Sequence, residues 1–447
     1  MRRNANIKVQ FISAVFLLIQ LAGFSQDNLV KRIADSLVKA LSISNNFSGE
    51  VLISKGDEII YKSISGRADF KNKKSIQENT MFCVGSITKT FTAVAIAKLW
   101  QQGSLKLDDP ISKFLPNFTH GDSITIRQLL NHTAGIKRET LDNLKIAARL
   151  FTSKQLVDSI SKYPLLFTPG SRQEYSNAGY TLLAKIIEVV SGKTYSDYLD
   201  QNIFSPLQMK NTKALMSGLE GNSISKGYDP SPSGVMQTYP ETPSFTFGAG
   251  NIFSTINDLY KWAIVYSTKT QILNQTTWDT VLKKAYGFGI YKRNNKIAIG
   301  HDGIVNGYIA NMDYFYKENV AIIFLSNIRS GALNYLADGL AQIYFDEKLS
   351  LPSLPEIVLH TGNQWKKYAG TYQLFPGFNL IVTSKKNILQ LRGQDGYNTY
   401  LAPIKNNSFF YRSMFSEIKF EEDKEMKTLI WKDLISGTIY PAKKISD

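Results

Sequence analysis

The stretch FCVGSITKTFTAVAIAKL, residues 82–99, decides how the chain is interpreted. Its second half is apolar almost all round, a pattern typical of a helix that is buried on every side. Ser86 and Lys89 stand at its start, three residues apart, so their side chains share one face of a helix. Because a charged amine is costly to bury, a lysine one turn into a buried helix indicates a functional role.

A serine hydroxyl needs a base to act as a nucleophile at neutral pH, and a lysine amine can be that base when burial or a nearby cation lowers its pKa. The spacing alone is weak evidence, because Ser-x-x-Lys recurs at Ser36, Ser159, Ser223 and Ser416. This segment therefore leaves two interpretations open. Ser86 is either a nucleophile beside backbone N–H groups that face an oxyanion, or a simple helix N-cap.

A second segment, EYSNAGY at residues 174–180, lies on a predicted loop that leads into a helix. The phenol of Tyr175, oriented toward Lys89, can carry a proton to a leaving group. The amide of Asn177 can orient the lysine or a substrate carbonyl. Taken separately, Tyr175 as a core aromatic and Asn177 as a turn or cap residue would be the more common case.

A third segment, GHDGI at residues 300–304, follows a predicted strand. His301 can line a cleft as a cation or proton donor. Gly303 permits close approach of a substrate, and the N–H of Ile304 can complete an oxyanion hole. The simpler alternative is a strand-end turn with an exposed histidine.

Together these segments resemble the serine β-lactamase-related family, specifically the class C branch with its β-lactamases, D-Ala-D-Ala carboxypeptidases, D-aminopeptidases and esterases. The similarity rests on Ser-x-x-Lys, Tyr-Ser-Asn and His-x-Gly in this order, and on the stretches 103–110, 124–136 and 248–255. It covers roughly residues 30–346. The segment YAGTY, residues 368–372, is similar to a small β-barrel appended to many of these enzymes.

The resemblance implies a role for each motif residue. Ser86 would be the acylated nucleophile, with Lys89 and Tyr175 as the general-base and general-acid pair. Asn177 would bind a substrate amide or orient Lys89. The backbone N–H groups of Ser86 and Ile304 would form the oxyanion hole.

The third segment departs from the β-lactamase pattern. His301 stands where many relatives carry lysine, so its charge at neutral pH is conditional, while Gly303 would still shape the strand edge. Asp302 occupies a position where β-lactamases usually place a small hydroxyl residue. If its carboxylate points into the cleft, it would repel an anionic substrate. Such repulsion would argue against efficient β-lactam hydrolysis and against carboxypeptidase action. His132, in another family stretch, is interpreted as structural.

Hydrophobic periodicity predicts an α+β fold, an antiparallel sheet flanked by helices plus an α-helical lobe over roughly 105–270. A β-lactamase-like hydrolase domain is expected over 26–348, a proline-containing linker over 349–365, and a small all-β, barrel-like domain over 366–447. Helices are expected at 29–44, 86–102 and 332–345, and strands at 49–53, 58–61, 286–291, 296–300, 308–316 and 320–326. Further strands are expected at 380–383, 388–392, 400–403, 408–411, 417–421 and 428–432.

The first 25 residues predict a secretory signal peptide, because a cationic start precedes an apolar run over 9–24. Cleavage is expected between Ser25 and Gln26, giving a secreted or periplasmic protein of a bacterial envelope. A membrane anchor is the alternative, but the run is short for a span and contains Gln10 and Gln20.

Composition argues against several other classes of protein. The formal net charge is +15, but the cations form no Arg-rich helix or aromatic-basic stripe, so we expect no nucleic-acid partner. The charge is compatible with a loose envelope association. The four histidines lack metal-binding spacing, and we expect no metal and no cofactor. The single cysteine, Cys83, is interpreted as a small buried hydrophobe. The oligomeric state is not predicted.

The sequence therefore predicts a serine hydrolase whose substrate is a small molecule or short peptide, such as a cell-wall fragment. Short-chain esters, D-amino-acid peptides and β-lactams are the expected substrates, in that order. The alternative is a catalytically silent protein that binds peptidoglycan or a signalling peptide on the same fold. The presence of Ser86, Lys89, Tyr175 and Asn177 favours the enzyme.

Overall fold

The chain of 447 residues is represented by a computed structural model. It describes residues 27–140, 148–218, 223–231, 234–238, 242–265, 267, 272–346, 355–358, 363–385, 388–393, 398–422, 427–434 and 437–446. The predicted signal peptide at 1–25 lies outside these residues, as do positions 349–354 and 359–362 of the predicted linker. Among the residues described, no helix is long and apolar enough to cross a bilayer.

A six-stranded antiparallel sheet forms the centre of the larger, N-terminal part, in the order β10-β11-β12-β13-β1-β2. The first hairpin therefore lies beside a strand from much later in the sequence, with Gly49 opposite Ser326. Every residue of β12 and β13 is buried, which explains the nearly continuous apolar sequence of β13. Strand β12 also buries Asn311 and Asp313, and Asp313 forms an ion pair with Arg293. The strands are β1 (Gly49–Lys55), β2 (Glu58–Ser65), β10 (Gly289–Arg293), β11 (Lys296–Val305), β12 (Tyr308–Phe315) and β13 (Val320–Ser326).

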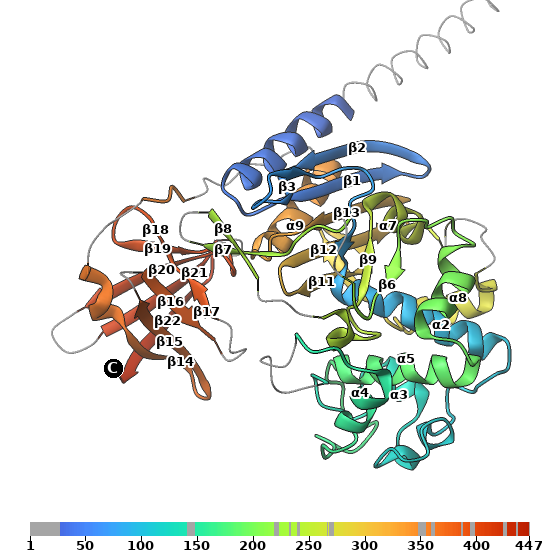
Figure 1. The fold of residues 1–447 in the computed structure, drawn as a ribbon. Coiled ribbons are helices and arrows are strands. Elements are labelled where there is room, and N and C mark those ends of the chain that lie inside the picture. The colour runs from blue at the N-terminus through green and yellow to red at the C-terminus, as the bar shows by residue number, and fades with distance from the viewer. Residues whose placement is uncertain are drawn as a thin grey trace, which may run out of the picture.

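Helices cover both faces of this sheet (Figure 1). Successive strand residues point to opposite faces, so Val51 and Ile53 pack with the helix over 27–43 and with α9 (Ala332–Asp346). Leu52, between them, packs into the other core, which is shared with the helical lobe. The predicted α+β arrangement of a helix-flanked antiparallel sheet is confirmed.

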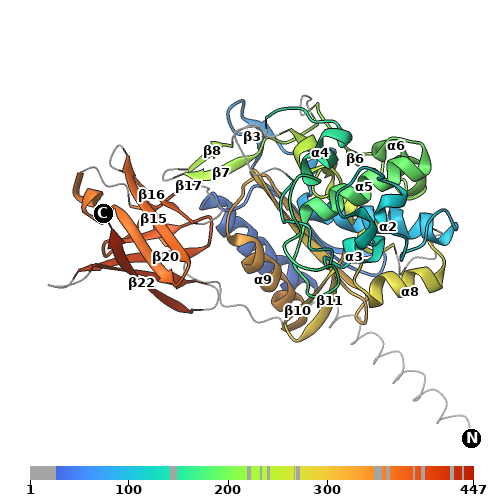
Figure 2. The same cartoon turned by 90° about the horizontal axis from the view of Figure 1, so that it is seen from below.

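The lobe is built around α2 (Thr88–Gln101), in which eleven of fourteen residues are buried. Its first turn differs from the expectation of a helix starting at Ser86: a 3₁₀ turn, η1 (Gly85–Ile87), precedes it. The other helices are α3 (Ile126–Leu130), α4 (Ser153–Ile160), α5 (Asn177–Ser191), α6 (Tyr195–Leu199), α7 (Ile256–Ala263) and α8 (Gln275–Lys283). Figures 1 and 2 both show α3, α4 and α5 gathered beside α2, and Figure 1 shows them on its side away from α9.

The C-terminal part is one nine-stranded antiparallel sheet, in the order β17-β16-β15-β14-β22-β21-β20-β19-β18. Its end strands are separated in sequence by Leu401 alone, so the sheet must curl until its edges nearly meet. The predicted barrel-like all-β domain is therefore confirmed. The strands are β14 (Gly370–Phe375), β15 (Phe378–Lys385), β16 (Ile388–Arg392), β17 (Asn398–Tyr400), β18 (Ala402–Pro403), β19 (Ser408–Tyr411), β20 (Ser416–Glu422), β21 (Lys427–Asp433) and β22 (Ile439–Ser446).

Two of these strands, β14 and β22, were not expected from the sequence. In β22 only Ala442 is buried, and Ile439, Tyr440 and Ile445 are exposed, so the usual apolar alternation is missing. Pairing with both neighbours, rather than an apolar face, makes this segment a strand.

Candidate active site

Ser86 is held at a close contact between two parts of the chain. Strand β5 (Phe82–Cys83) pairs with β9 (Ile252–Ser254) and is followed, after Val84, by η1. Gly85 has φ +53°, and a Cβ there would lie 3.1 Å from both the Cα of Gly303 and the N of Ile304. A Cβ on Gly303 would lie 2.0 Å from the carbonyl oxygen of Val84. Both positions therefore require glycine for Ser86 to sit beside strand β11.

Lys89 is completely buried behind the serine. Its Nζ donates to the Oγ of Ser86 at 3.1 Å and to the carbonyl oxygen of Ala249 at 2.8 Å. Burial lowers the pKa of Lys89 to about 7; the charge of Glu139 opposes this shift, and that of Arg138 adds to it. An amine with this pKa is substantially unprotonated near neutral pH and can accept a proton from Ser86.

Tyr175 approaches the same oxygen from the loop before α5. Its hydroxyl donates to the Oγ of Ser86 at 2.9 Å. Burial raises the pKa of Tyr175 above its usual range, and its hydrogen bond with Ser86 only partly offsets this shift. The phenol therefore stays protonated at neutral pH. Of the two partners of Ser86, Lys89 is thus suited to be the base and Tyr175 the proton donor.

Asn177 begins α5, but its side chain turns to an acidic neighbour. The amide nitrogen donates to both carboxylate oxygens of Glu139, at 3.0 and 3.1 Å. Within the described part of the chain, no hydrogen bond joins Asn177 to Lys89. Orientation of Lys89 by Asn177, one of two roles expected, is thus not seen, and binding of a substrate amide stays a prediction. Glu139 was missed because it follows the family stretch that ends at residue 136.

The third segment lies inside strand β11 rather than after a strand, so the interpretation as a strand-end turn is wrong. His301 is only 9% exposed, and its ring centroid lies 6.4 Å from that of Tyr175. The side chain of Ile304 is 58% exposed, while its backbone nitrogen lies beside Gly85. Ser86 and Ile304 thus bring their N–H groups to the same junction, as an oxyanion hole requires.

Asp302 is directed at the neighbouring strand. Its carboxylate accepts a hydrogen bond from the hydroxyl of Tyr291 on β10, at 3.2 Å, and lies 3.5 Å from the Nδ1 of His301. Burial opposes ionisation, but the interactions with His301 and Tyr291 outweigh it and keep the pKa of Asp302 below its usual value. Strand alternation turns His301 and Asp302 to opposite faces, so the condition that Asp302 points into the cleft is not met.

His132 supports Tyr175 rather than Ser86. Its Nδ1 accepts a hydrogen bond from the backbone N–H of Ser176 at 3.0 Å, and its ring stacks on Tyr175 with centroids 4.6 Å apart. Burial lowers the pKa of His132 to about 3, so the imidazole is neutral. Both contacts agree with the structural role expected. Cys83 is buried, with its sulfur 3.2 Å from the carbonyl oxygen of Gly250.

Ala249 and Tyr291 also contribute to the site without having been predicted to do so. Ala249 supplies a backbone carbonyl, which no side-chain motif reveals, although its stretch 248–255 was noted for its family likeness. Asn251 shapes that turn, because its Oδ1 accepts from the N–H of Gly248 at 2.9 Å.

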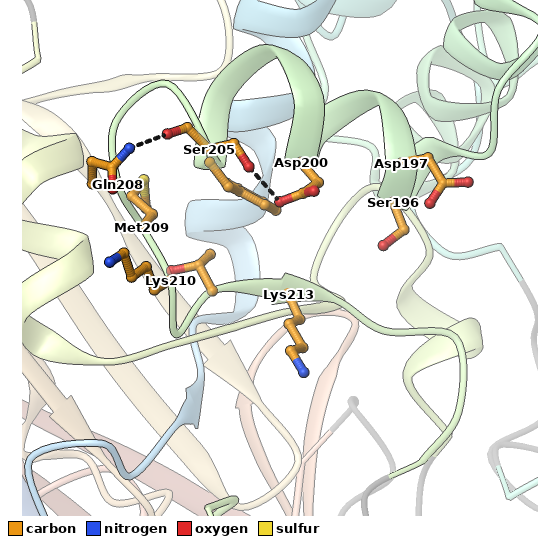
Figure 3. Close-up of a pocket in the computed structure, with 10 residues that line it drawn as sticks. Ser196, Asp197, Asp200, Ser205, Gln208, Met209, Lys210 and Lys213 are labelled. Carbon is orange, nitrogen blue, oxygen red and sulfur yellow. Dashed lines mark hydrogen bonds between the residues drawn. The ribbon is translucent and has the colours of Figure 1, made fainter.

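A separate pocket of about 400 Å³ is lined by residues of α6 and of the segment that follows it, between Ser196 and Lys213. Figure 3 shows Asp197 and Asp200 on the helical side and Lys210 and Lys213 on the strand side. None of the motif residues lines it. Among the described residues, no three His, Cys, Asp or Glu side chains gather as a metal site would need.

Comparison with known proteins agrees with this geometry. The beta-lactamase family model matches residues 34–344, more than half of the sequence. The chain belongs to the beta-lactamase family. This family membership places the chain in the serine hydrolase superfamily. The class C branch in particular stays a prediction.

Individual members of the beta-lactamase family extend the match. Penicillin-binding protein 4* of Bacillus subtilis is 27% identical over 438 residues, 89% of this chain and 96% of the relative. The D-amino acid amidase of Ochrobactrum anthropi SV3, complexed with L-phenylalanine, is 25% identical with a TM-score of 0.61 and covers 67% of this chain and 91% of its own. The octameric penicillin-binding protein homologue of Pyrococcus abyssi has a TM-score of 0.60 at 22% identity. The match covers 92% of this chain and 99% of the homologue.

Proposed function

We propose that this protein is a serine hydrolase that forms an acyl-enzyme on Ser86 with ester or amide substrates. One observation carries the proposal: the Oγ of Ser86 lies within hydrogen-bond distance of both the Nζ of Lys89 and the hydroxyl of Tyr175. A nucleophile with a base whose pKa is about 7 and a protonated donor is what acyl transfer needs.

The mechanism follows from these positions. The unprotonated Lys89 takes the proton of Ser86 while the Oγ attacks the substrate carbonyl carbon. The carbonyl oxygen becomes an oxyanion between the N–H groups of Ser86 and Ile304. The tetrahedral adduct then collapses, the leaving group takes the phenol proton of Tyr175, and the phenolate regains a proton from the Lys89 ammonium. A water molecule repeats the sequence on the acyl-enzyme and releases the acid.

Charge around the site favours neutral or cationic substrates. Glu139 and Asp302 both place negative charge near Lys89, Asp302 more weakly because it faces Tyr291 rather than the cleft, and Arg138 is the opposing cation. We therefore propose short esters and D-amino-acid amides or peptides ahead of β-lactams, which carry a carboxylate. The similarity to a D-amino acid amidase supports an amide with a free amine. Rapid nitrocefin turnover that is unchanged in Asp302→Asn would contradict this ranking.

We further propose that the protein is secreted or periplasmic, with a loose attachment to the bacterial envelope, and acts on cell-wall-derived fragments. The cationic start and apolar run over residues 1–25 and the net charge of +15 support this location. Fractionation of the native host, with amino-terminal sequencing for cleavage between Ser25 and Gln26, tests it.

Intact-mass spectrometry tests the activity itself. The protein is exposed to a fluorophosphonate, a short ester, a penicillin, and the D and L forms of phenylalanine amide. We expect one adduct per chain on Ser86, lost in Ser86→Ala. Ser36→Ala is the matched control, because Ser36 begins an identical Ser-x-x-Lys spacing on an exposed helix surface. Ligand binding without any acylation would instead support a catalytically silent binding protein.

A further inference from the structure

One buried arginine of the C-terminal sheet reaches across to the catalytic part. Arg412, which follows β19, is 1% exposed, and all five of its N–H donors are used. Its Nε donates to the Oδ1 of Asn46 at 3.3 Å. One terminal nitrogen donates to the carbonyl oxygens of Ser231 at 2.6 Å and Gly234 at 2.7 Å. The other donates to those of Ser44, at 3.0 Å, and Asn45.

Two of these carbonyls belong to a hairpin that needs outside support. Strand β7 (Tyr228–Ser231) forms a two-stranded sheet with β8 (Gly234–Gln237), and only its first residue, Tyr228, is also bridged to Ile328 among the described residues. Strand β8 is half-buried or exposed throughout. A two-stranded hairpin of this kind is marginally stable by itself. Figures 1 and 2 both place it between the C-terminal sheet and the rest of the molecule. Arg412 binds the last residue of one strand and the first of the other, and so clamps the hairpin at the end where its two strands are connected.

The base of the hairpin contacts the end of the strand that carries the third motif. The N–H of Tyr228 donates to the carbonyl oxygens of Gly307, at 3.3 Å, and Asn327, at 2.9 Å. A Cβ on Gly227 would lie 3.1 Å from the Cα of Gly307, so the two backbones touch. Gly307 lies in the turn between β11 and β12, three residues after Ile304. Movement of the hairpin therefore passes directly to the end of β11.

We propose that Arg412 is a positioning residue for catalysis: by clamping the β7–β8 hairpin it fixes the end of strand β11, and with it the N–H of Ile304 beside Ser86. The C-terminal sheet thereby contributes to the active site without contacting substrate. The effect of Arg412 on kcat rests on the proposed function. The clamping of the hairpin does not, because it is a structural property that can be measured separately.

The test compares Arg412→Lys with Phe415→Leu. Lysine keeps the charge but cannot reach five acceptors. Phe415 stacks on Tyr335 of α9 with ring centroids 5.0 Å apart and packs in the core that docks the same sheet. Among the described residues, no hydrogen bond or ring contact joins it to the hairpin. We expect Arg412→Lys to lower kcat for a short ester by on the order of ten- to a hundredfold at little change in KM, the effect of displaced reacting groups. Phe415→Leu should lower thermal stability and leave kcat nearly unchanged.

Hydrogen exchange gives a readout that does not need activity. We expect faster exchange in peptides covering 228–238 and 305–308 in Arg412→Lys, and not in Phe415→Leu. Asp229→Asn is a second variant for the case that Arg412→Lys does not fold, because it breaks the 2.8 Å ion pair between Asp229 and Arg329 that holds the hairpin from its other side. It should change kcat and exchange in the same direction.

The proposal is overturned if the clamp variants keep normal kcat and exchange, or if Phe415→Leu lowers kcat as much as they do. The first result shows that the hairpin is held without Arg412. The second shows that docking of the sheet is all that matters. Failure of the wild-type protein to acylate at Ser86 would instead overturn the proposed function, and the exchange comparison would still decide whether Arg412 clamps the hairpin.

Discussion

The chemistry of the site depends on burial acting in opposite directions on two neighbouring groups. Removal from water disfavours the charged form, so it lowers the pKa of the Lys89 amine and raises that of the Tyr175 phenol. Near pH 7 a substantial share of the Lys89 amine is thus neutral and able to accept a proton, while the Tyr175 phenol is neutral and able to donate one. Ser86 lies between them.

The pH dependence of activity should follow Lys89. Because the amine must be unprotonated to accept the proton of Ser86, kcat/KM for a neutral ester is expected to rise with pH through about 7 and then level off. Stopped-time assays from pH 5 to 9 check this. Lys89→Arg, which stays charged, should lose both the rise and most of the rate. A profile with no inflection between pH 6 and 8 would rule out Lys89 as the base.

Tyr175→Phe keeps the ring that stacks on His132 and removes only the hydroxyl that donates to Ser86. We expect kcat to fall by roughly 10²- to 10⁴-fold, the usual worth of a positioned proton donor, with little change in thermal stability. Tyr180→Phe is the control, since that buried phenol donates to the carbonyl oxygen of Leu130 instead. It should reduce stability more than activity, and equal losses of activity in the two variants would argue against a specific role for Tyr175.

At the scale of elements, the site is made where η1 meets strand β11 with no side chains between them. Gly85 and Gly303 make this contact, and neither the helix start nor the strand could approach so closely with a Cβ present. The separation of the Ser86 and Ile304 N–H groups is therefore set by backbone packing.

Gly303→Ala should push this junction apart, because the new Cβ would lie 2.0 Å from the carbonyl oxygen of Val84. We expect acylation of Ser86 by a fluorophosphonate to slow by at least about tenfold, because the oxyanion donors separate. Gly103→Ala serves as the comparison, since it imposes a strained φ of +74° where no atom lies within 4 Å. That variant should lose some stability and acylate normally. Normal acylation in Gly303→Ala would mean that η1 and β11 can move apart to accommodate the new Cβ without impairing the reaction.

At the scale of the whole molecule, the two halves share a core. Phe410 and Phe415 of the C-terminal sheet belong to the same buried cluster as Leu37 of the first helix and Leu336 of α9. A smaller core, around Tyr372 and its neighbours, is the sheet's own. The C-terminal domain is therefore packed onto the catalytic part, and burial of this apolar surface stabilises the pair together.

The central sheet also buries an ionisable group whose charged form is unfavourable there. Glu50 of β1 is fully buried, and neither of its carboxylate oxygens has a hydrogen-bond partner. Burial raises its pKa to about 8; attraction to Lys62 opposes the shift, and repulsion from Glu78 adds to it. The folded protein thus holds a proton on Glu50 at pH values where the unfolded chain, with a value near 4.5, has lost it.

Stability should consequently fall as pH rises from about 4.5 to about 8, because the unfolded state binds fewer protons than the folded one. The contribution of Glu50 to the slope of unfolding free energy against pH approaches about 1.4 kcal/mol per pH unit. Urea unfolding of wild type and Glu50→Gln at pH 5.5, 7 and 8.5 measures it. The variant should be the more stable at pH 8.5 and have a shallower slope, with Glu78→Gln as the control on the exposed neighbour. Identical slopes would show that Glu50 is ionised in the fold.

The sequence by itself predicted most of the elements and proposed the reacting groups. Helix 332–345 and strands 308–316 and 320–326 were predictable because their apolar pattern is local. Ser86, Lys89 and Tyr175 were proposed because their motifs occur together in the order of a known family, although each motif alone is weak evidence. The tertiary structure alone decided what joins distant segments: the carbonyl of Ala249 on Lys89, the turn of Asp302 toward Tyr291, and the reach of Arg412 to the β7–β8 hairpin. Backbone acceptors have no side-chain signature, and a side chain's direction is set by the partner that folding brings to it.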